Sequence, residues 1–344
     1  KYLSSTIATN VSDKTVILIE EMSDQLKGAD IVSETARYYP NGAVLSHVIG
    51  YMGSISDYQY EEYVNEKGYS ATDLIGKDGI EAVMEEYLRG TDGVTAVRVN
   101  SLGDYIDTIS ESEPEAGQNV YLTVDLDLQK VAEDSLAEII RATKSGTRYN
   151  GKYGTSYVSK YDNCESGAVV ALDVETGEVL AMASYPTFDL NNPTDLAAYY
   201  SEEEIAKMQE EETFYDTCNQ LWRNFCIQDT YEPGSTAKSL TISAALDAGK
   251  LSGNETYDCQ GALEVSGHKI RCHKRIGHGI LDVSGTLEQS CNVGLMRVAA
   301  NMGNDMFMKY LTNYNMGLKT NIDLAGESRT VGLVHTPESM GETE

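Results

Sequence analysis

The sequence has few basic residues and no long apolar run. Its 344 residues include 26 Lys and Arg against 54 Asp and Glu, which gives a formal net charge of −28 at pH 7. Proteins that bind nucleic acid normally present a basic surface, so we expect no nucleic-acid partner. No stretch approaches the roughly 18 to 20 consecutive apolar residues of a membrane-spanning helix. Because the sequence opens at Lys1 without a signal peptide, we expect either a soluble protein or a sequence that starts after an anchor.

Cysteine is also scarce. Six cysteines in a chain of this length do not make a disulfide scaffold. Hydrophobic residues make up 41% of the chain and charged residues 23%, which is the composition of a folded globular protein rather than a disordered one. A chain of 344 residues is long enough for two or three domains, each with its own core.

Residues 1–110 are predicted to form a first, non-catalytic domain that mixes helices with short strands. Apolar residues recur at helical spacing over 77–90, and the alternating run over 94–99 predicts a strand. The segment 111–118 is polar and acidic and contains proline and glycine. We therefore predict a linker there.

Residues 119–344 are predicted to form a second domain of the α+β class, in which helices pack against an antiparallel sheet. Apolar spacing predicts a long helix over 125–144, and two apolar strands around a Glu-Thr-Gly turn predict a hairpin over 167–173 and 178–184. The polar segments 145–164 and 186–230 are expected to be a loop and a surface excursion.

A candidate nucleophile lies at the start of a predicted helix. Pro233 and Gly234 end the preceding structure, and small and apolar residues follow. Ser235 is therefore expected at a helix N-terminus, with Lys238 one turn behind it on the same face. A serine hydroxyl needs a neighbouring base, and a lysine whose pKa is lowered by burial and positive charge can be that base. The alternative is an ordinary N-capping serine, because Ser266 to Lys269 repeats the motif without the breaker or the helix.

A second motif, Ser290-Cys291-Asn292, begins 55 residues after Ser235 and lies between two helical stretches. Ser252 to Asn254 also matches Ser-x-Asn, so the inference depends on the order and spacing of the two motifs together. In that order they resemble the serine acyl-transferases that bind penicillin, whose signature also includes Lys-Thr-Gly.

The resemblance is closest to the class B penicillin-binding proteins of the penicillin-binding protein 2 type, which are monofunctional D,D-transpeptidases of peptidoglycan synthesis. It covers most of the chain from residue 37 onward, with its parts in the right order. The stretches that carry it are 37–42, 46–51, 75–81, 88–90, 122–125, 128–129, 167–173, 231–238, 277–279 and 317–324.

This resemblance implies a fold and a role for each motif residue. The fold would be a penicillin-binding transpeptidase domain preceded by an N-terminal α/β pedestal of the dimerisation type. Ser235 would be the nucleophile that attacks the D-Ala–D-Ala carbonyl, and Lys238 its general base. Ser290 would relay protons between Lys238 and the leaving or entering amine, and Asn292 would bind the backbone amide of the substrate. The amine of a second stem peptide would resolve the acyl-enzyme, and catalysis would require no cofactor.

The same resemblance implies ligands, partners and a location. The ligands would be peptidoglycan stem peptides and β-lactam antibiotics, which would leave the nucleophile trapped as a slow ester. Other cell-wall synthesis membrane proteins would bind through residues 1–110. The protein would work at the extracytoplasmic face of the cell membrane, anchored by an N-terminal helix that precedes Lys1.

Two other functions are compatible with a similar fold. One is a non-catalytic cell-wall scaffold or β-lactam sensor, and the other is a serine β-lactamase. The presence of both Ser235 and Lys238 argues against a protein without chemistry. The pedestal-like stretches between residues 37 and 90 argue against a single-domain β-lactamase.

One family feature is missing, since no Lys-Thr-Gly follows Ser290. Lys144-Ser145-Gly146 precedes the nucleophile, and Lys319-Thr320-Asn321 belongs to a different family-like stretch. The expected Lys-Thr-Gly strand would lie beyond Glu344, so we expect a C-terminally incomplete chain. A molecule that ended there would lack one wall of the cleft and is expected to acylate poorly or not at all.

A candidate structural zinc site overlaps the second motif. Three thiols and one imidazole form an accepted ligand set for structural zinc. They follow one another at intervals of 13, 6 and 13 residues, as Cys259, Cys272, His278 and Cys291. A disulfide between the first two cysteines, or free buried thiols, are the alternatives. The nearby His268 and His273 are predicted to be surface residues.

Overall fold

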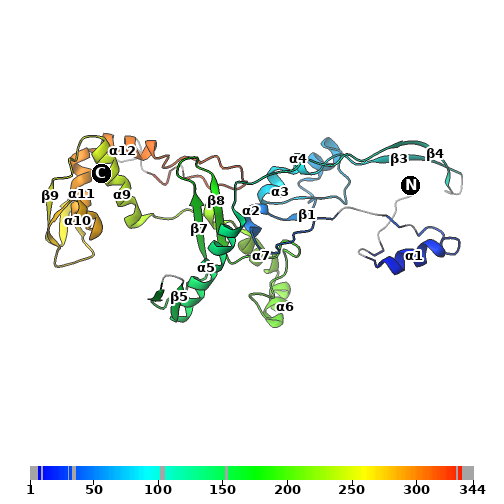
Figure 1. Ribbon diagram of the computed structural model, residues 1–344, viewed down its shortest axis with the longest axis horizontal. Helices are drawn as coiled ribbons and strands as arrows, with labels where there is room; N and C mark the ends of the chain where they lie inside the picture. Colours follow the sequence, from blue (N-terminus) through cyan, green and yellow to red (C-terminus); the bar gives the residue numbers. More distant parts are fainter. Residues whose placement is uncertain are drawn as a thin grey trace. The chain divides into compact units, whose positions relative to one another are not determined.

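The computed structural model describes residues 7–8, 11–29, 31–32, 36–100, 105–151, 154–330 and 332–334. The chain divides into two compact units, Lys1–Gly42 and Ala43–Glu344. The first contains α1 (Asp13–Glu21), whose N-terminus is capped by Ser12, since the hydroxyl of Ser12 accepts a 3.3 Å hydrogen bond from the backbone N–H of Thr15. This helix buries no residue (Figure 1).

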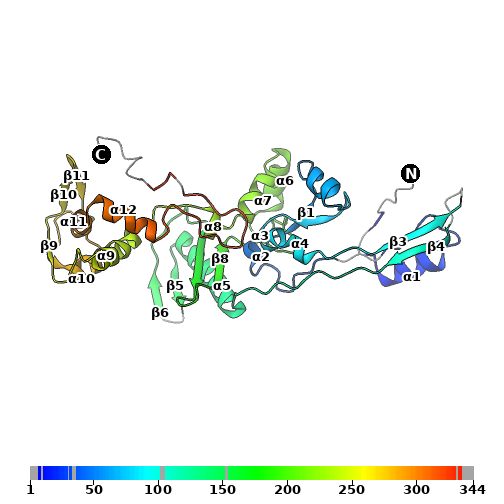
Figure 2. The ribbon, with the colours of Figure 1, turned by 90° about the horizontal axis from the view of Figure 1, so that it is seen from above.

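The second unit begins with short helices and two antiparallel strand pairs. Its elements are α2 (Ser46–Ile49), β1 (Met52–Ser54), the π-helix η1 (Glu61–Glu66), β2 (Leu74–Gly76), α3 (Gly79–Val83), α4 (Glu85–Leu88), β3 (Val94–Val99) and β4 (Tyr105–Ser112). Strand β1 pairs with β2, and β3 pairs with β4 in a two-stranded ribbon (Figure 2). The predicted strand over 94–99 is confirmed, whereas the predicted helix over 77–90 is two helices, because Met84 between them leaves the helical conformation.

The polar segment predicted as a linker, 111–118, is joined to the residues before it by strand pairing. Strand β4 includes its first two residues. Further along, Glu115 and Thr91 exchange two backbone hydrogen bonds of 2.9 Å. Part of this segment therefore extends the β3–β4 ribbon.

A long helix covers the next strand pair. Helix α5 (Leu126–Ser145) packs on β7 (Gly167–Leu172) and β8 (Val179–Tyr185), as predicted, with Leu136, Ile140 and Ala183 in the core between them (Figure 1). Gln129 is fully buried, and its side-chain amide bonds to both backbone groups of Met182, at 2.9 and 2.8 Å. The amide thereby satisfies two backbone groups of β8, as a neighbouring strand would do.

Two segments predicted to be irregular contain regular structure. Strands β5 (Arg148–Gly151) and β6 (Gly154–Tyr157) form a hairpin inside 145–164. The segment 186–230 holds α6 (Glu202–Glu210), α7 (Phe214–Trp222) and α8 (Phe225–Gln228). The prediction that 186–230 is a surface excursion is wrong in part, because Leu196, Cys218 and Leu221 are buried. Phe214, Cys218, Leu221 and Trp222 follow the i, i+4, i+7, i+8 spacing of an amphipathic helix, so the sequence does carry a signal for α7.

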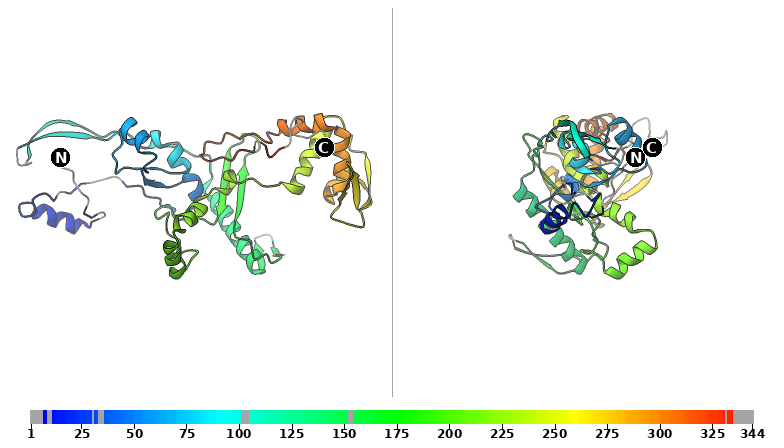
Figure 3. Two further views of the ribbon diagram at one scale, coloured as in Figure 1. Left: turned by 180° about the vertical axis from the view of Figure 1, so that it is seen from behind. Right: turned by 90° about the vertical axis from the view of Figure 1, so that its right-hand side faces the viewer.

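The last group of elements surrounds one hydrophobic core. It comprises the 3₁₀ turn η2 (Gly234–Thr236), α9 (Ala237–Asp247), β9 (Thr256–Cys259), β10 (Ala262–Val265), β11 (His268–Arg271), β12 (Gly279–Asp282), α10 (Val283–Glu288), α11 (Asn292–Met302) and α12 (Asn304–Asn313). Helix α11 contacts α9, α12 and β9 (Figure 3). Ile242 of α9, Leu295 and Val298 of α11 and Tyr257 of β9 are buried in this core.

All strand pairs in the described part of the chain are antiparallel and two-stranded, and helices pack beside them. This confirms the predicted α+β class. No helix in the described ranges combines the length and the apolar character that crossing a membrane requires.

Candidate active site

Ser235 lies in the tight turn that leads into α9. The turn η2 consists of Gly234, Ser235 and Thr236, and α9 begins at the next residue. Gly234 has φ +55°, a conformation that residues with a side chain rarely adopt. Pro233 with its fixed φ precedes it, so the Pro-Gly pair builds the sharp entry that the sequence predicts. The Ser235 side chain is exposed at the start of the helix.

Lys238 lies one turn later and is joined to the second motif by three hydrogen bonds. Its Nζ donates to the backbone oxygen of Ser290 at 2.8 Å, to the hydroxyl of Ser290 at 2.8 Å and to Oδ1 of Asn292 at 2.7 Å. The Ser290 hydroxyl lies 3.1 Å from the hydroxyl of Ser235 and donates to it. The four residues predicted from the two motifs thus form one continuous hydrogen-bonded network.

Ser290 reaches this network from a left-handed backbone conformation. Its φ is +47°, and it joins α10 to α11. A non-glycine residue in this region costs about 1–3 kcal/mol and is retained where the surroundings impose it. Here the next residue, Cys291, is only 1% exposed and caps α11, its sulfur accepting a 3.4 Å hydrogen bond from the N–H of Gly294. The buried cap holds the bend, and the bend aims Ser290 at Lys238.

Asn292 connects the network to a neighbouring hairpin. Its Oδ1 accepts from Lys238, and its Nδ2 donates to the backbone oxygen of Arg271 at 3.2 Å. Arg271 ends β11, which pairs with β10. Since a side-chain amide carries two N–H hydrogens, the second one can donate to a ligand carbonyl.

The two chance copies of the motifs lie elsewhere. Ser266 occupies the turn between β10 and β11, and the chain continues after it as strand β11 rather than as a helix. Ser252 lies in a turn and bonds to Glu255 at 2.9 Å. Neither residue shares a hydrogen bond with Ser235 or Lys238 in the described structure. The Pro-Gly pair is therefore the sequence feature that distinguishes Ser235, which joins the network, from Ser266, which does not.

The four predicted zinc ligands also converge. The ligand atoms of Cys259, Cys272, His278 and Cys291 all lie within 4.8 Å of one another, and the three cysteines are about 1% exposed. All six cysteines of the chain are free thiols in the structure, so it holds no disulfide between Cys259 and Cys272. His268 and His273 are exposed, as predicted.

Burial and backbone N–H groups act in opposite directions on these thiols. Burial opposes ionisation of Cys272, but the backbone N–H groups of Asn292, Lys274 and Val293 leave its pKa below the ordinary value. Burial raises the pKa of Cys291 to about 11. Burial, together with the nearby positive charges, lowers the pKa of His278, which favours the neutral imidazole that a metal ligand needs.

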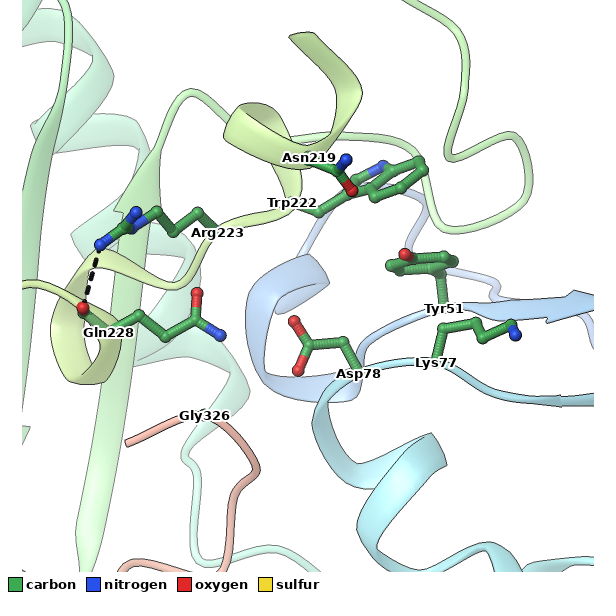
Figure 4. Close-up of a pocket in the computed structure, with 8 residues that line it drawn as sticks. All are labelled: Tyr51, Lys77, Asp78, Asn219, Trp222, Arg223, Gln228 and Gly326. Atoms are coloured by element: carbon green, nitrogen blue, oxygen red, sulfur yellow. Dashed lines mark hydrogen bonds between the residues drawn. The ribbon is translucent and has the colours of Figure 1, made fainter. Parts of the chain in front are cut away.

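A separate pocket of about 400 Å³ lies away from this network and was not predicted from the sequence (Figure 4). It is lined by Tyr51, Lys77, Asp78, Asn219, Trp222, Arg223, Gln228 and Gly326. The rings of Tyr51 and Trp222 lie 4.2 Å apart, and burial raises the pKa of Asp78. Gly50 permits this wall to form, because a Cβ there would be 1.8 Å from the backbone oxygen of Asp78.

Two family models match the chain over ranges that include these sites. Residues 1–122 match the penicillin-binding protein dimerisation domain, and residues 167–337 match the penicillin-binding protein transpeptidase domain. The chain is a member of the penicillin-binding protein family. The two models follow one another in the order expected of a class B protein, with the dimerisation domain before the transpeptidase domain.

Relatives and solved structures agree with this assignment. The penicillin-binding protein is 30% identical over 334 residues to the peptidoglycan D,D-transpeptidase MrdA of Acinetobacter baumannii, covering 96% of this chain and 44% of that protein. It is 32% identical over 332 residues to MrdA of Escherichia coli, covering 95% and 47%. The fold is similar to that of penicillin-binding protein PBP2 from Helicobacter pylori, solved as a complex with MreC, with a TM-score of 0.67 and 25% identity over 93% of this chain and 52% of that one. The chain thus spans less than half of the length of these two curated relatives.

Proposed function

We propose that this penicillin-binding protein is a serine-type peptidoglycan D,D-transpeptidase that cross-links stem peptides and is acylated by β-lactams. The observation that carries the proposal is the continuous network from Ser235 through Ser290 to Lys238, with bonds of 3.1 and 2.8 Å. Such a network lets a serine hydroxyl lose its proton as it attacks a carbonyl. The relatives named as D,D-transpeptidases support the same activity.

The network suggests which path the proton takes. Of the three groups bonded to Lys238 Nζ, the backbone oxygen of Ser290 and Oδ1 of Asn292 can only accept a hydrogen bond. The Ser290 hydroxyl alone can reverse and donate to a neutral amine. In our proposal the Ser235 proton therefore passes to Ser290 while the Ser290 proton passes to Lys238. This differs from direct removal of the Ser235 proton by Lys238, which the family resemblance suggested.

The proposed reaction then proceeds in two steps. The Ser235 oxygen attacks the carbonyl carbon of the D-Ala–D-Ala bond, the carbon–nitrogen bond breaks, and D-alanine leaves with the proton returned from Lys238 through Ser290. The acyl group remains on Ser235 as an ester. The amine of a second stem peptide attacks the carbonyl carbon of this ester and the ester carbon–oxygen bond breaks. The proton that the amine loses returns through Lys238 and Ser290 to the Ser235 oxygen, which frees the serine and forms the cross-link. Asn292 would hold the acyl chain through its second N–H.

Labelling with a fluorescent penicillin tests the proposal. The full-length gene product and its Ser235→Ala variant are incubated with the reagent and compared by gel fluorescence. We expect the parent to be labelled and the variant to carry no covalent label, while both unfold at the same temperature. Equal labelling of the two proteins would overturn the assignment of Ser235.

We also propose that Cys259, Cys272, His278 and Cys291 bind a structural zinc ion. Zinc–sulfur bonds of about 2.3 Å in tetrahedral geometry place ligand atoms about 3.8 Å apart. The observed spread, within 4.8 Å, is close to this arrangement. When bound, the ion would join the four segments that carry its ligands and would have no catalytic role, since a closed set of four protein ligands leaves no position for substrate. Cys291 separates Ser290 from Asn292, so the ion would fix the segment that carries both.

Elemental analysis of protein purified without chelator tests this second proposal. We expect about one equivalent of zinc in the parent and far less in a Cys291→Ser variant. A Cys164→Ser variant, which changes a cysteine outside the cluster, is the matched control and should keep the metal. Less than about one-tenth of an equivalent in the parent would overturn the proposal.

Partners and location belong to the same proposal. We infer that residues 1–110 contact other cell-wall synthesis proteins and that the enzyme works at the extracytoplasmic face of the membrane. The H. pylori structure, a complex between PBP2 and MreC, supports a protein partner of this kind. Co-purification of an MreC-like protein with the parent, and its loss when residues 1–110 are removed, would support the inference. Retention of that partner after the removal would contradict it.

A further inference from the structure

The pocket shown in Figure 4 is lined mainly by polar side chains. Five of its eight lining residues carry a charged or amide group, namely Lys77, Asp78, Asn219, Arg223 and Gln228. All of them belong to the unit Ala43–Glu344. The pocket volume of about 400 Å³ lies within the range of about 300–1,000 Å³ that small-molecule sites occupy. Because most such sites have apolar linings, this one is suited to a hydrophilic ligand.

An aromatic pair forms one wall of this pocket. The ring centres of Tyr51 and Trp222 lie 4.2 Å apart. Nε1 of Trp222 donates a 2.7 Å hydrogen bond to the backbone oxygen of Pro193, and Tyr51 meets the ring of Phe188 edge to face. These contacts hold the wall in position without a ligand. Aromatic side chains supply apolar surface with partly negative faces, which suits the C–H groups of a sugar ring.

The charged groups of the pocket favour neither an anion nor a cation. Arg223 is already paired with Asp229 at 2.8 Å. The ammonium group of Lys77 donates to Oε1 of Gln59 at 2.5 Å. The carboxylate of Asp78 forms no salt bridge within the described part of the chain. An anion would meet this carboxylate and a cation would meet the two basic groups, so a neutral ligand fits best.

The hydrogen-bonding groups that remain in the pocket both donate and accept. The Asn219 amide is exposed on α7 and has no hydrogen-bond partner among the described residues. The Asp78 carboxylate accepts from the N–H of Gly79 at 2.8 Å and from the side chain of Gln228, which leaves lone pairs for a ligand donor. Figure 4 shows Asp78 and Gln228 directed toward one another. Sugar hydroxyl and acetamido groups also donate and accept, so they match this set.

We propose that this pocket binds N-acetylated sugars of a peptidoglycan glycan strand. The proposal rests on the proposed transpeptidase function and adds a site for the part of the substrate that does not react. An acetamido group carries one N–H and one carbonyl oxygen, and the Asn219 amide can bond to both. The sugar ring lies against Tyr51 and Trp222, and its hydroxyls donate to Asp78.

The position of the pocket along the chain suits such a role. Gln228, which lines the pocket, precedes Ser235 by seven residues. An extended chain advances at most about 3.6 Å per residue, so the Cα atoms of these two residues lie no more than about 25 Å apart. A glycan strand is longer than this. A strand held in the pocket can therefore extend toward Ser235 with its stem peptides.

The fluorescence of Trp222 tests the proposal. It is the single tryptophan of the 344 residues and it lines the pocket, so a bound sugar should change its emission. The full-length gene product is titrated with chitotetraose, an oligomer of N-acetylglucosamine, and with cellotetraose, which has hydroxyls in place of the acetamido groups. A Trp222→Phe variant identifies the part of the signal that comes from the pocket.

We expect a saturable change with chitotetraose, with half-saturation below about 1 mM. Cellotetraose should bind about threefold or more weakly, because a neutral hydrogen bond is worth a few-fold in affinity. A response to chitotetraose that stays linear up to about 1 mM, or equal affinity for the two sugars, would overturn the proposal. An equal change caused by a sugar-free pentapeptide ending in D-Ala–D-Ala would overturn it too, since the pocket would then bind peptide.

Matched variants show whether the signal depends on the lining residues. Asn219→Ala should lose the preference for chitotetraose, whereas Asn301→Ala, which removes another exposed asparagine of a helix, should keep it. Asp78→Asn, which retains a group able to cap α3, should weaken the binding of both sugars. Thermal unfolding checks that each variant is folded. Equal effects of the two asparagine variants would contradict the proposal.

These outcomes are distinct from failure of the proposed function. Penicillin labelling of the parent protein reports on Ser235 and needs no sugar. A parent that is labelled at Ser235 but does not bind chitotetraose would refute the sugar site and leave the transpeptidase proposal intact. A parent that binds chitotetraose in the pocket but is not labelled would refute the assignment of Ser235 and leave the sugar site in place.

Discussion

Lys238 Nζ lies 2.8 Å from both the hydroxyl and the backbone oxygen of Ser290, two atoms of a residue 52 positions away. The backbone oxygen fixes the ammonium group, and the hydroxyl links it to Ser235 at 3.1 Å. Ser290 is therefore both the anchor of the lysine and its only route to the nucleophile in the described network. This relationship leads to the first prediction.

Ser290→Ala should lower the rate of acylation by a penicillin by about 10²- to 10³-fold, the usual effect of losing a proton-transfer group. The backbone contact to Lys238 stays, so stability should change little. The measurement is the second-order rate of labelling in the full-length gene product. Ser266→Ala is a matched control, because Ser266 also has a left-handed backbone, at φ +48° against +47°. A Ser290→Ala protein that acylates at the parent's rate would refute the relay.

A second prediction concerns the contact between α10 and α11. A Cβ on Gly294 would lie 2.4 Å from the Cγ2 atom of Thr286, so Gly294→Ala should push the two helices apart. We expect a loss of about 1–3 kcal/mol in the free energy of unfolding. Slower acylation should accompany it, since Ser290 lies between these helices. Urea unfolding and penicillin labelling measure the two effects.

The double variant Thr286→Ala/Gly294→Ala checks this explanation. The hydroxyl of Thr286 is buried without a hydrogen-bond partner in the described structure, so its removal leaves no group unsatisfied. With the threonine methyl gone, the new alanine methyl has space. We expect the double variant to recover most of the lost stability. If the two single losses simply add, the contact is not the cause.

A third prediction concerns pH. His47 is 5% exposed, its Nε2 donates to the backbone oxygen of Leu221 at 3.0 Å, and burial lowers its pKa to about 4. The unfolded chain takes up this proton near pH 6.5 and the folded protein only near pH 4, so stability is full above 6.5 and falls between the two values. The loss should reach about 3 kcal/mol at pH 4.

Urea unfolding from pH 7.5 to pH 4 measures this effect. His47→Gln should be less stable than the parent at neutral pH but should lose less stability on acidification. His268→Gln, which removes an exposed histidine, should follow the parent curve. A parent and a His47→Gln variant with equal pH dependence would show that His47 does not carry it. Glu133, whose pKa burial raises, acts in the opposite direction in both proteins and cancels in the comparison.

A fourth prediction concerns the proposed metal. Treating the parent with a chelator should lower its melting temperature by several degrees and slow penicillin labelling, because Ser290 and Asn292 flank the ligand Cys291. Adding zinc back should restore both quantities. The Cys272→Ser variant should resemble the chelated parent and should not respond to zinc. A chelated parent with unchanged melting and labelling would show that no metal supports this segment.

Local sequence patterns predicted the elements that depend on local chemistry. The spacing of apolar residues predicted α5 within one residue at each end, and the Glu-Thr-Gly turn predicted the β7–β8 hairpin. The Pro-Gly breaker predicted the turn that presents Ser235. In each case the residues that decide the structure are neighbours along the chain.

Contacts between distant residues could not be predicted in this way. No pattern in the sequence indicates that the Gln129 amide bonds to the backbone of Met182. None indicates that Asn292 binds the carbonyl of Arg271. Helix α7 was missed although Cys218 and Leu221 follow helical spacing, because the helix is short, at nine residues, and lies in a polar and acidic stretch. The convergence of the two motifs at Lys238 was inferred from a family resemblance, which their order and spacing support, and not from any local pattern.

Cys291 belongs to both the buried cysteine cluster and the catalytic segment. It caps α11 from within the cluster, and it lies between Ser290 and Asn292 in the chain. An insertion or deletion of one residue in this segment would displace the nucleophile's neighbours and the thiol together. Variation in this segment is therefore expected to proceed by substitution at constant length. Changes in loop length should accumulate instead at turns such as the one between β10 and β11, where no residue belongs to both a buried cluster and the hydrogen-bonded network.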